Sequence, residues 1–264
     1  MSSFSSSQKS LRWGVKALDE LESVIGHFFS LNPYARRAYV DPKTQEQVIE
    51  YVRTIDFPLD EIERRFNESM LCFRNAFDQA AFAACAAIDK TIRPNDTIYF
   101  PWADSESGCE KRLRGKSCKI PEKLWPTFLG LKPYGTLDSG TTDEYVSREL
   151  AKVANRKHST GFAVGGDIAR ALGPGKFVIT DPAGVTWAPP KDRTWDPMKE
   201  QIEILRYPPG MEFHGQETVY FNVVFDRSTS LKGTPIVPAL RSFSAKAEHS
   251  IETLMTEIAR ITRG

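Results

Sequence analysis

Residues 59–88 read LDEIERRFNESMLCFRNAFDQAAFAACAAI and follow directly after Phe57-Pro58. Their apolar residues recur at steps of three and four, which places them on one face of an α-helix about eight turns long. This face consists of Leu59, Ile62, Phe66, Met70, Phe73, Phe77, Ala81, Ala84 and Ile88. The pattern predicts a central helix that buries this face and ends before Pro94.

Two further long helices are predicted over residues 8–29 and 236–262, where apolar residues again recur every three or four positions. Shorter helical patterns cover residues 124–131 and 145–154. The N-terminal stretch Met1–Ser10 is rich in serine and has no apolar segment. We therefore expect residues 1–10 to be a disordered leader rather than a secretory signal.

Strand-like runs occur in two places. Residues 36–40 and 47–55 flank the polar turn Asp41-Pro42-Lys43-Thr44 and predict a β-hairpin after the first helix. Near the C-terminus, β-rich runs separated by proline- and glycine-containing turns are found at 176–180, 201–207 and 218–226. Between the two places, residues 161–175 are rich in glycine and are interpreted as a flexible connector, because the lysine after Gly175 is not followed by the hydroxyl residue of a phosphate loop.

The predicted fold class is α+β, because helices and strands do not alternate as they do in a parallel sheet. We expect one domain over residues 11–264. Its helical core covers residues 11–172 and 236–262, and an antiparallel strand-rich insert covers residues 176–232, before the last helix.

Composition and charge exclude several classes of protein. The 264 residues carry 35 basic and 34 acidic side chains, so that no excess positive charge is available for a nucleic-acid coat. Hydrophobic residues make up 41%, which is too many for a disordered chain. No apolar stretch of about 18 residues is present, and we expect no membrane association.

Cysteine usage indicates a cytoplasmic protein. Cys72, Cys85, Cys109 and Cys118 are too few and too irregularly spaced for a disulfide framework. Cys109 and Cys118 are candidates for a pair or a metal site, but no Cys-x-x-Cys motif or neighbouring histidine supports zinc. The sequence therefore predicts no metal and no cofactor.

Arg74 and Asp78 are the first candidates for a functional site. They are four residues apart on the central helix, so their side chains are neighbours on one face, with Asn67 two turns earlier. The structural interpretation is an ion pair that locks the helix against its neighbour. The functional interpretation is an arginine that binds a phosphate or carboxylate, together with Asn67 and Asp78.

The segment Asn155-Arg156-Lys157-His158 follows a predicted helix and has two interpretations as well. Cations at the C-terminal end of a helix are favoured by the helix dipole, which is a sufficient structural reason for Lys157 and His158. His158 is also a candidate general acid or base, with Asn155 and Lys157 as binding residues. The isolated residues His214 and His249 are interpreted as structural or surface residues.

A basic run lies between Glu110 and Lys123. It contains four more basic than acidic side chains, namely Lys111, Arg112, Arg114, Lys116, Lys119 and Lys123 against Glu110 and Glu122. One interpretation is a solvated loop. The other is a phosphate-binding patch with Arg112, Arg114 and Lys116 as binding residues.

The chain resembles a widespread family of bacterial proteins, most of them uncharacterised, whose central helix typically reads G-D-x-x-H-N-L-R-S-A-L-D-H. The corresponding residues here are 67–79, NESMLCFRNAFDQ. Further resemblance lies in ALDELE at 17–22, NPY at 32–34, FP at 100–101, LKPY at 131–134, NRKH at 155–158 and GTPIV at 233–237. The order of these blocks is more specific than any one of them.

The R-x4-H spacing of that family is similar to the signature of HEPN (higher eukaryotes and prokaryotes nucleotide-binding) domains. This resemblance implies a helical, often dimeric core, in which an arginine steadies the scissile phosphate of RNA and a histidine moves a proton. Gln79 occupies the histidine position here and Leu71 that of the family's earlier histidine. Because glutamine is not a useful base, the nuclease site is expected to be degenerate.

Three hypotheses follow. The first is a cytoplasmic HEPN-like homodimer that binds RNA or a protein partner without cleavage, in phage defence or a toxin–antitoxin system. The second is an active, metal-independent ribonuclease that uses Arg74 and His158 as catalytic residues. The third is a non-catalytic scaffold or regulatory protein.

Overall fold

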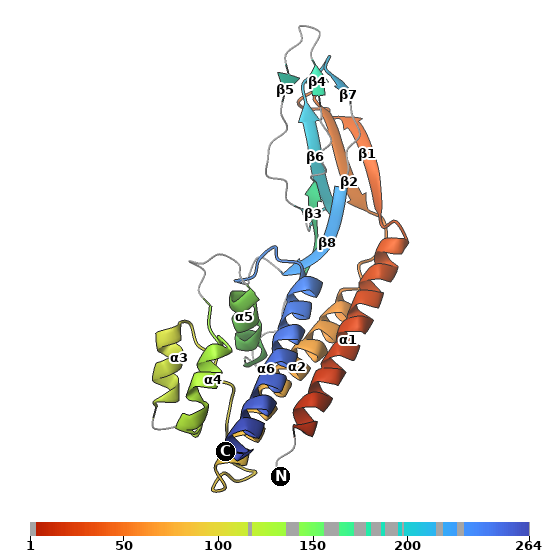
Figure 1. The fold of residues 1–264 in the computed structure, drawn as a ribbon. Coiled ribbons are helices and arrows are strands. Elements are labelled where there is room, and N and C mark those ends of the chain that lie inside the picture. The colour runs from red at the N-terminus through yellow and green to blue at the C-terminus, as the bar shows by residue number, and fades with distance from the viewer. Residues whose placement is uncertain are drawn as a thin grey trace. The chain divides into compact units, whose positions relative to one another are not determined.

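Figure 1 shows the fold of the chain as a computed structural model. The structure describes residues 4–115, 118–135, 143–155, 164–171, 178–180, 186–187, 195–196, 198–214, 219–225 and 230–263. The chain folds into two compact units. The helical unit contains Met1–Ser23, Asp60–Phe162 and Ile236–Gly264, and the sheet unit contains Val24–Leu59 and Ala163–Pro235.

The described part of the chain has a mixed, α+β fold, as predicted. Its helices are α1 (Ser5–Ser30), α2 (Leu59–Ile88), α3 (Glu106–Leu113), the 3-10 helix η1 (Glu122–Leu124), α4 (Trp125–Gly130), α5 (Asp143–Asn155) and α6 (Ile236–Arg263). The central helix has the bounds that its apolar pattern predicts, and the other predicted helices are confirmed with ends shifted by a few residues.

The core of the helical unit forms where α1, α2 and α6 run side by side (Figure 1). The apolar face of α2 is buried from Ile62 to Ala84, as predicted. Phe243 of α6 packs against this face, with ring centroids 5.2 Å from Phe77 and 6.2 Å from Phe73. Burial of large aromatic side chains supplies most of the stabilisation in such a core.

The first turns of α1 differ from the expected leader, because α1 begins at Ser5 and residues 5–10 are helical. Ser7 and Ser10 are buried, with exposed fractions of 1% and 6%. The Ser7 hydroxyl donates to the carbonyl of Phe4 at 2.7 Å, and the Ser10 hydroxyl donates to Oε1 of Gln79 on α2 at 2.9 Å. Ser10 attaches the start of the helix to α2 through a polar contact, and no apolar stripe is needed there, which is why no periodic pattern marks the helix over these residues.

Part of the basic run forms a helix rather than a loop. Glu110–Leu113 belong to α3, which begins at the N-cap Ser105, whose side chain accepts a hydrogen bond from the amide of Gly108 at 3.1 Å. Cys109 and Leu113, four residues apart, are the buried residues of α3. The basic side chains consequently lie on the remaining sides of the helix.

The described strands of the sheet unit form three antiparallel sheets. The first has the order β1 (Tyr34–Val40), β2 (Gln47–Arg53) and β6 (Gln201–Tyr207). The second pairs β3 (Val164–Ala171) with β8 (Val219–Phe225). The third has the order β5 (Thr186–Trp187), β4 (Val178–Thr180) and β7 (Glu212–His214).

Two features of the sheet unit differ from the sequence-based interpretation. The hairpin β1–β2 joins the later strands, because β2 pairs with β6, whereas the prediction assigned the hairpin to the helical core. The connector interpretation of residues 161–175 was wrong over 164–171, which form β3. Pairing with β8 supplies the backbone hydrogen bonds that the glycine-rich sequence of β3 does not signal.

One guanidinium group organises the charged edge of the first sheet. Arg206 of β6 donates to Asp41 at 2.9 Å, to Glu46 at 3.1 Å and to Glu203 at 2.9 Å. Asp41 also shapes the hairpin turn, since its Oδ1 accepts the amide of Lys43 at 2.9 Å. Arg206 therefore links the turn of the hairpin to the third strand of the sheet.

Candidate functional site

Arg74 occupies a buried position on α2, with an exposed fraction of 5%. Its Nε donates to Oδ2 of Asp78 at 3.0 Å, as the spacing of four residues predicts. The other carboxylate oxygen, Oδ1 of Asp78, accepts a hydrogen bond from the backbone amide of Phe100 at 2.9 Å. Asp78 therefore holds both Arg74 and the chain segment that follows α2.

One nitrogen of the Arg74 guanidinium is a hydrogen-bond donor that is not used. Its Nη1 is buried and has no hydrogen-bond acceptor among the described residues. The ring of Trp102 lies 5.9 Å from the guanidinium carbon and offers a cation–π contact. A buried donor without an acceptor is unfavourable by about 1–3 kcal/mol, so this arrangement lowers the stability of the fold.

Arg112 of α3 and Tyr99 lie close enough to Arg74 to influence its pKa. Burial lowers the pKa of Arg74, the charge and hydrogen bond of Asp78 raise it, and the positive charge of Arg112 lowers it further. Arg112 is exposed, and 60% of the Tyr99 side chain is accessible to solvent. One further cation, Arg112, and one exposed aromatic residue, Tyr99, thus lie within electrostatic range of Arg74.

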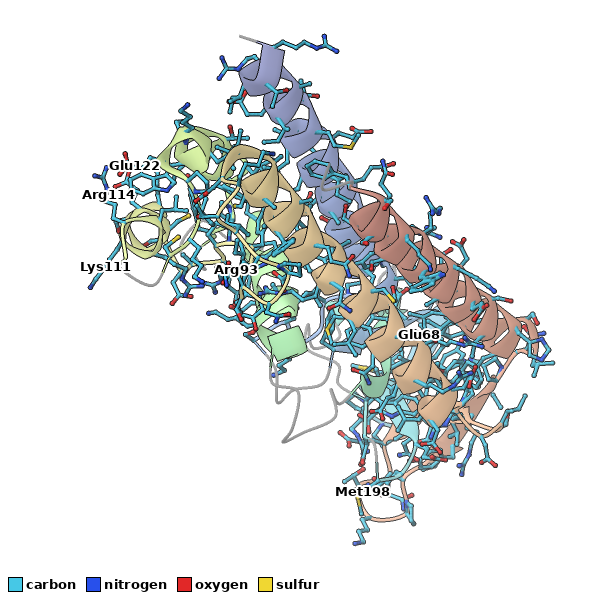
Figure 2. The ribbon with its side chains drawn as sticks, turned by 90° about the horizontal axis from the view of Figure 1, so that it is seen from below. Glu68, Arg93, Lys111, Arg114, Glu122 and Met198 are labelled. Atoms are coloured by element: carbon cyan, nitrogen blue, oxygen red, sulfur yellow. The ribbon has the colours of Figure 1, made fainter. Side chains whose placement is uncertain are left out.

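We use the name basic face for four exposed cations: Lys111 and Arg112 of α3, its C-cap Arg114, and Arg93 in the segment after α2. Figure 2 shows Lys111 and Arg114 projecting outward from α3. Arg114 lies over the ring of Trp125, 5.6 Å from its centroid. All four side chains are exposed, and none of them forms an ion pair with a described residue.

The ion pairs elsewhere make the basic face distinctive. A carboxylate partner is present for Arg53, Arg64, Arg65, Arg148, Arg206, Arg241 and Arg260. Most of the described arginines are thus neutralised within the protein, whereas those of the basic face are available to an external anion. The face also includes three of the six cations of the basic run.

A second charged network lies beside this region. Arg148 of α5 donates from Nη1 to Asp104 at 3.0 Å, and Lys152 contacts the same carboxylate at 2.7 Å. The hydrogen bond from Lys152 lowers the pKa of Asp104, and the charges of Lys152, Arg148 and Arg112 lower it further. Asp104 is therefore ionised, and its negative charge partly offsets the positive charge of Arg112.

The structure brings together some of the predicted site residues. Arg74 and Asp78 form an ion pair, the charge of Arg112 lowers the pKa of Arg74, and Arg114 at the end of α3 lies over the ring of Trp125. Asn67 lies seven residues before Arg74, about 10 Å along the helix axis, and its side chain makes no hydrogen bond with a described residue. It is not part of the arginine site.

Other predicted site residues lie outside the described residues. These are Lys116, Lys157 and His158, while Asn155 is the last residue of α5 and its side chain is not described. The catalytic pairing of Arg74 with His158 therefore stays a prediction.

Sequence reasoning missed Tyr99, Trp102 and Arg148. Tyr99 and Trp102 follow α2 in the segment that Asp78 holds through Phe100, and Arg148 comes from α5. No local spacing connects Tyr99 and Trp102 with Arg74, because the segment after α2 reaches Arg74 only in the folded chain. The only signal in the sequence is the clustering of aromatic residues in the segment 99–102, YFPW.

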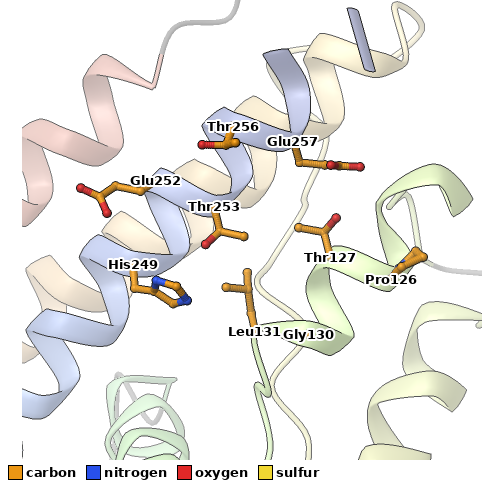
Figure 3. Close-up of a pocket in the computed structure, with 9 residues that line it drawn as sticks. All are labelled: Pro126, Thr127, Gly130, Leu131, His249, Glu252, Thr253, Thr256 and Glu257. Atoms are coloured by element: carbon orange, nitrogen blue, oxygen red, sulfur yellow. The ribbon is translucent and has the colours of Figure 1, made fainter. Parts of the chain in front are cut away.

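A separate open pocket of about 710 Å³ lies between α4 and α6 (Figure 3). It is lined by Pro126, Thr127, Gly130, Leu131, His249, Glu252, Thr253, Thr256 and Glu257. His249 is exposed and makes no hydrogen bond with a described residue, so no oriented acid–base pair is present there. Glu257 is bound by Arg260 at 2.7 Å. This pocket does not compete with the arginine site as a place for chemistry.

Comparisons with known proteins identify no relative: no family model, no curated protein and no solved structure matches the chain. Among the described residues, no group of three or more His, Cys, Asp and Glu side chains is placed to hold a metal ion. Within the same residues, none of the helices has the length and apolar character needed to span a bilayer.

Proposed function

We propose that the helical unit binds single-stranded RNA at the basic face and does not cleave it. The observation that carries this proposal is the set of exposed cations of the basic face that have no carboxylate partner among the described residues. Arginine binds phosphate oxygens through two parallel N–H groups, and exposed rings such as Tyr99 stack on unpaired bases. A net charge of +1 over the whole chain restricts this attraction to one region.

The absence of cleavage follows from the residue at the family's histidine position. Gln79 carries an amide, which does not accept a proton at neutral pH. Its Oε1 already accepts the hydroxyl of Ser10, so this side chain serves the contact between α1 and α2. In this proposal the helical unit is a HEPN-like core with a degenerate nuclease site, in a cytoplasmic protein that forms homodimers.

The test is fluorescence anisotropy with a labelled single-stranded oligouridylate over a range of salt concentrations. The triple variant Lys111→Ala, Arg112→Ala, Arg114→Ala is expected to bind more weakly. Each phosphate contact on a single strand contributes about 0.7 to the slope of log K against log salt, so the slope should fall by about 2. A matched triple variant on α1, Lys9→Ala, Arg12→Ala, Lys16→Ala, should bind like the wild type.

Three outcomes would contradict the proposal. The first is that the wild type does not bind the RNA at physiological salt. The second is that both triple variants lose affinity equally, because equal losses would indicate non-specific electrostatic attraction. The third is cleavage of the RNA by the wild type that Arg74→Ala abolishes. That result would instead support the ribonuclease hypothesis with Arg74 and His158. Circular dichroism of all variants confirms that each is folded.

A further inference from the structure

One side of α1 carries four exposed side chains, Lys9, Arg12, Trp13 and Lys16, which we call the cationic stripe. Steps of three and four residues place them next to one another on the helix surface. Trp13 is 54% exposed, and 78% of the Lys16 side chain is accessible to solvent. The stripe is therefore presented to solvent over about two turns of the helix.

The cations of the stripe are not neutralised within the described part of the protein. Neither Lys9 nor Arg12 forms an ion pair with a described residue. Lys16 lies 3.9 Å from Glu20, and Glu20 is also bound by Arg65 of α2. Three positive charges thus face solvent, and the carboxylate beside them is shared with another cation.

The helix itself gives no reason for these residues. Residues 5–18 contain the three cations and no acidic side chain, although the N-terminal end of a helix favours acidic residues. The exposed Trp13 likewise gives up the stabilisation that burial of a large apolar side chain supplies. Both features indicate a contact outside the fold.

A second exposed apolar residue lies beside the stripe. Met255 of α6 is 39% exposed, and its sulfur accepts a hydrogen bond from the side-chain amide of Gln8 at 3.7 Å. Figure 1 shows the N-terminal end of α1 and the C-terminal end of α6 at the same end of the helical unit. The surface thus combines three cations with two exposed apolar side chains.

These features favour a lipid surface over nucleic acid and over protein. Lys9 covers one face of the Trp13 ring, with its ammonium 4.6 Å from the ring centroid, so this face is not open to stacking on a base. Two of the three cations are lysines, which are depleted from protein–protein interfaces. Lysine, arginine and tryptophan are together typical of helices that lie in the surface of a bilayer.

We propose that the cationic stripe binds peripherally to a bilayer of anionic phospholipids. Its three cations contact lipid phosphates, and the indole of Trp13 enters the headgroup region, where amphipathic rings are favoured. Such a contact requires no spanning helix. It revises the expectation of no membrane association, which rested on the absence of a long apolar stretch. The contact is independent of the basic face and of RNA.

The test is sedimentation of the full-length protein with vesicles of phosphatidylglycerol and phosphatidylcholine in equal amounts, at about 0.1 M salt. One cation near an anionic surface contributes about fivefold to the affinity, so the triple variant Lys9→Ala, Arg12→Ala, Lys16→Ala should bind about 100-fold more weakly. The triple variant of the basic face is the matched control and should bind the vesicles like the wild type. Because the two triple variants have opposite expected effects on lipid and on RNA, failure of this proposal is distinguishable from failure of the proposed function.

Trp13 gives a second measurement that does not depend on the removal of charge. Bromine on lipid acyl chains quenches the fluorescence of nearby indoles, so vesicles with brominated phosphatidylglycerol should quench the wild type. Trp13→Phe should show little quenching. Trp125→Phe, at the start of α4, is the control and should be quenched like the wild type.

Four outcomes would overturn the proposal. The first is a wild type that does not sediment with the anionic vesicles, and the second is equal sedimentation with vesicles of phosphatidylcholine alone. The third is loss of vesicle binding by the triple variant of the basic face, which would assign the contact to that face. The fourth is binding to polyglutamate but not to vesicles, which would assign the cationic stripe to an acidic protein partner.

Discussion

Arg74 and Asp78 depend on each other unequally. Asp78 retains the backbone amide of Phe100 as a donor when Arg74 is removed, whereas Asp78 is the only acceptor for Arg74 among the described residues. A guanidinium stays protonated throughout the pH range in which proteins fold. Loss of the carboxylate therefore leaves a buried charge without compensation, and loss of the arginine does not.

This asymmetry predicts the stability of the single variants. Asp78→Ala should lower the free energy of unfolding by about 3 kcal/mol, the usual effect of breaking a buried pair from one side. Arg74→Met, which fills a similar volume without charge, should lower it by only about 1 kcal/mol. Urea unfolding at pH 7 measures both values. An Arg74→Met variant at least as unstable as Asp78→Ala would contradict this asymmetry. The double variant should lower the free energy of unfolding by less than the sum of the two single effects, because the residues are in contact.

At the scale of elements, α1 and α2 approach closely at Gly14. The hydroxyl of Ser69 on α2 donates to the carbonyl of Gly14 at 3.0 Å, so one short side chain bridges the two helices there. A Cβ at position 14 would lie 2.6 Å from two ring carbons of Phe73, which is itself fully buried. The glycine is therefore required by packing, although it weakens the helix.

The prediction compares two glycines of the same helix. Gly14→Ala should lower the free energy of unfolding by about 1–3 kcal/mol, because the ring of Phe73 has to move within a filled core. Gly26→Ala meets no atom within 4 Å and should raise it by about 0.5–1 kcal/mol through helix propensity alone. Thermal and urea unfolding of the two variants provide the measurement. Equal effects at both positions would exclude the close approach as the cause.

Elements whose apolar residues recur at a regular spacing were predicted from the sequence, and elements that depend on partners far away in the sequence were not. The apolar spacing of α2 fixes both its bounds and its buried face, and β6 likewise spans the predicted residues 201–207. β3 was missed because its backbone partners in β8 are distant in the sequence, as the pairing of Val164 with Phe225 and of Ala171 with Val219 shows. The same reason hides the pairing of β2 with β6, since register between distant strands leaves no local pattern.

The candidate site shows the same division. The contact between Arg74 and Asp78 follows from a spacing of four residues on one helix, and Arg112 was recognised by its local charge. The roles of Phe100 and Trp102 were not predictable, because a backbone amide and a ring reach Arg74 and Asp78 only after the chain turns back along α2. His158 lies outside the described residues, so its part in the site stays a prediction.

At the scale of the whole molecule, 34 acidic side chains balance 35 basic ones, and acid removes this balance by protonating the carboxylates. The sheet unit depends on it through Arg206 and its three carboxylate partners. The hydrogen bond from Arg206 holds the pKa of Asp41 below its usual value of 3.8. A carboxyl with a lowered pKa in the folded state stabilises the fold above its unfolded pKa, and this contribution is lost as the pH falls through the folded value.

Acid should therefore loosen the first sheet, and removal of Arg206 should imitate part of this effect at neutral pH. Hydrogen exchange of the peptides covering Gln47–Arg53 and Gln201–Tyr207, corrected for intrinsic rates, measures both. Arg206→Gln is expected to reduce protection at pH 7, and its difference from the wild type should shrink once the pH falls below 3.8. Arg260→Gln, which removes an exposed pair with Glu257 on α6, is the control and should leave these peptides unchanged. If Arg206→Gln were as protected as the wild type at pH 7, the strands would be held by their apolar cluster of Ile49, Trp195, Ile202, Ile204 and Leu205 alone.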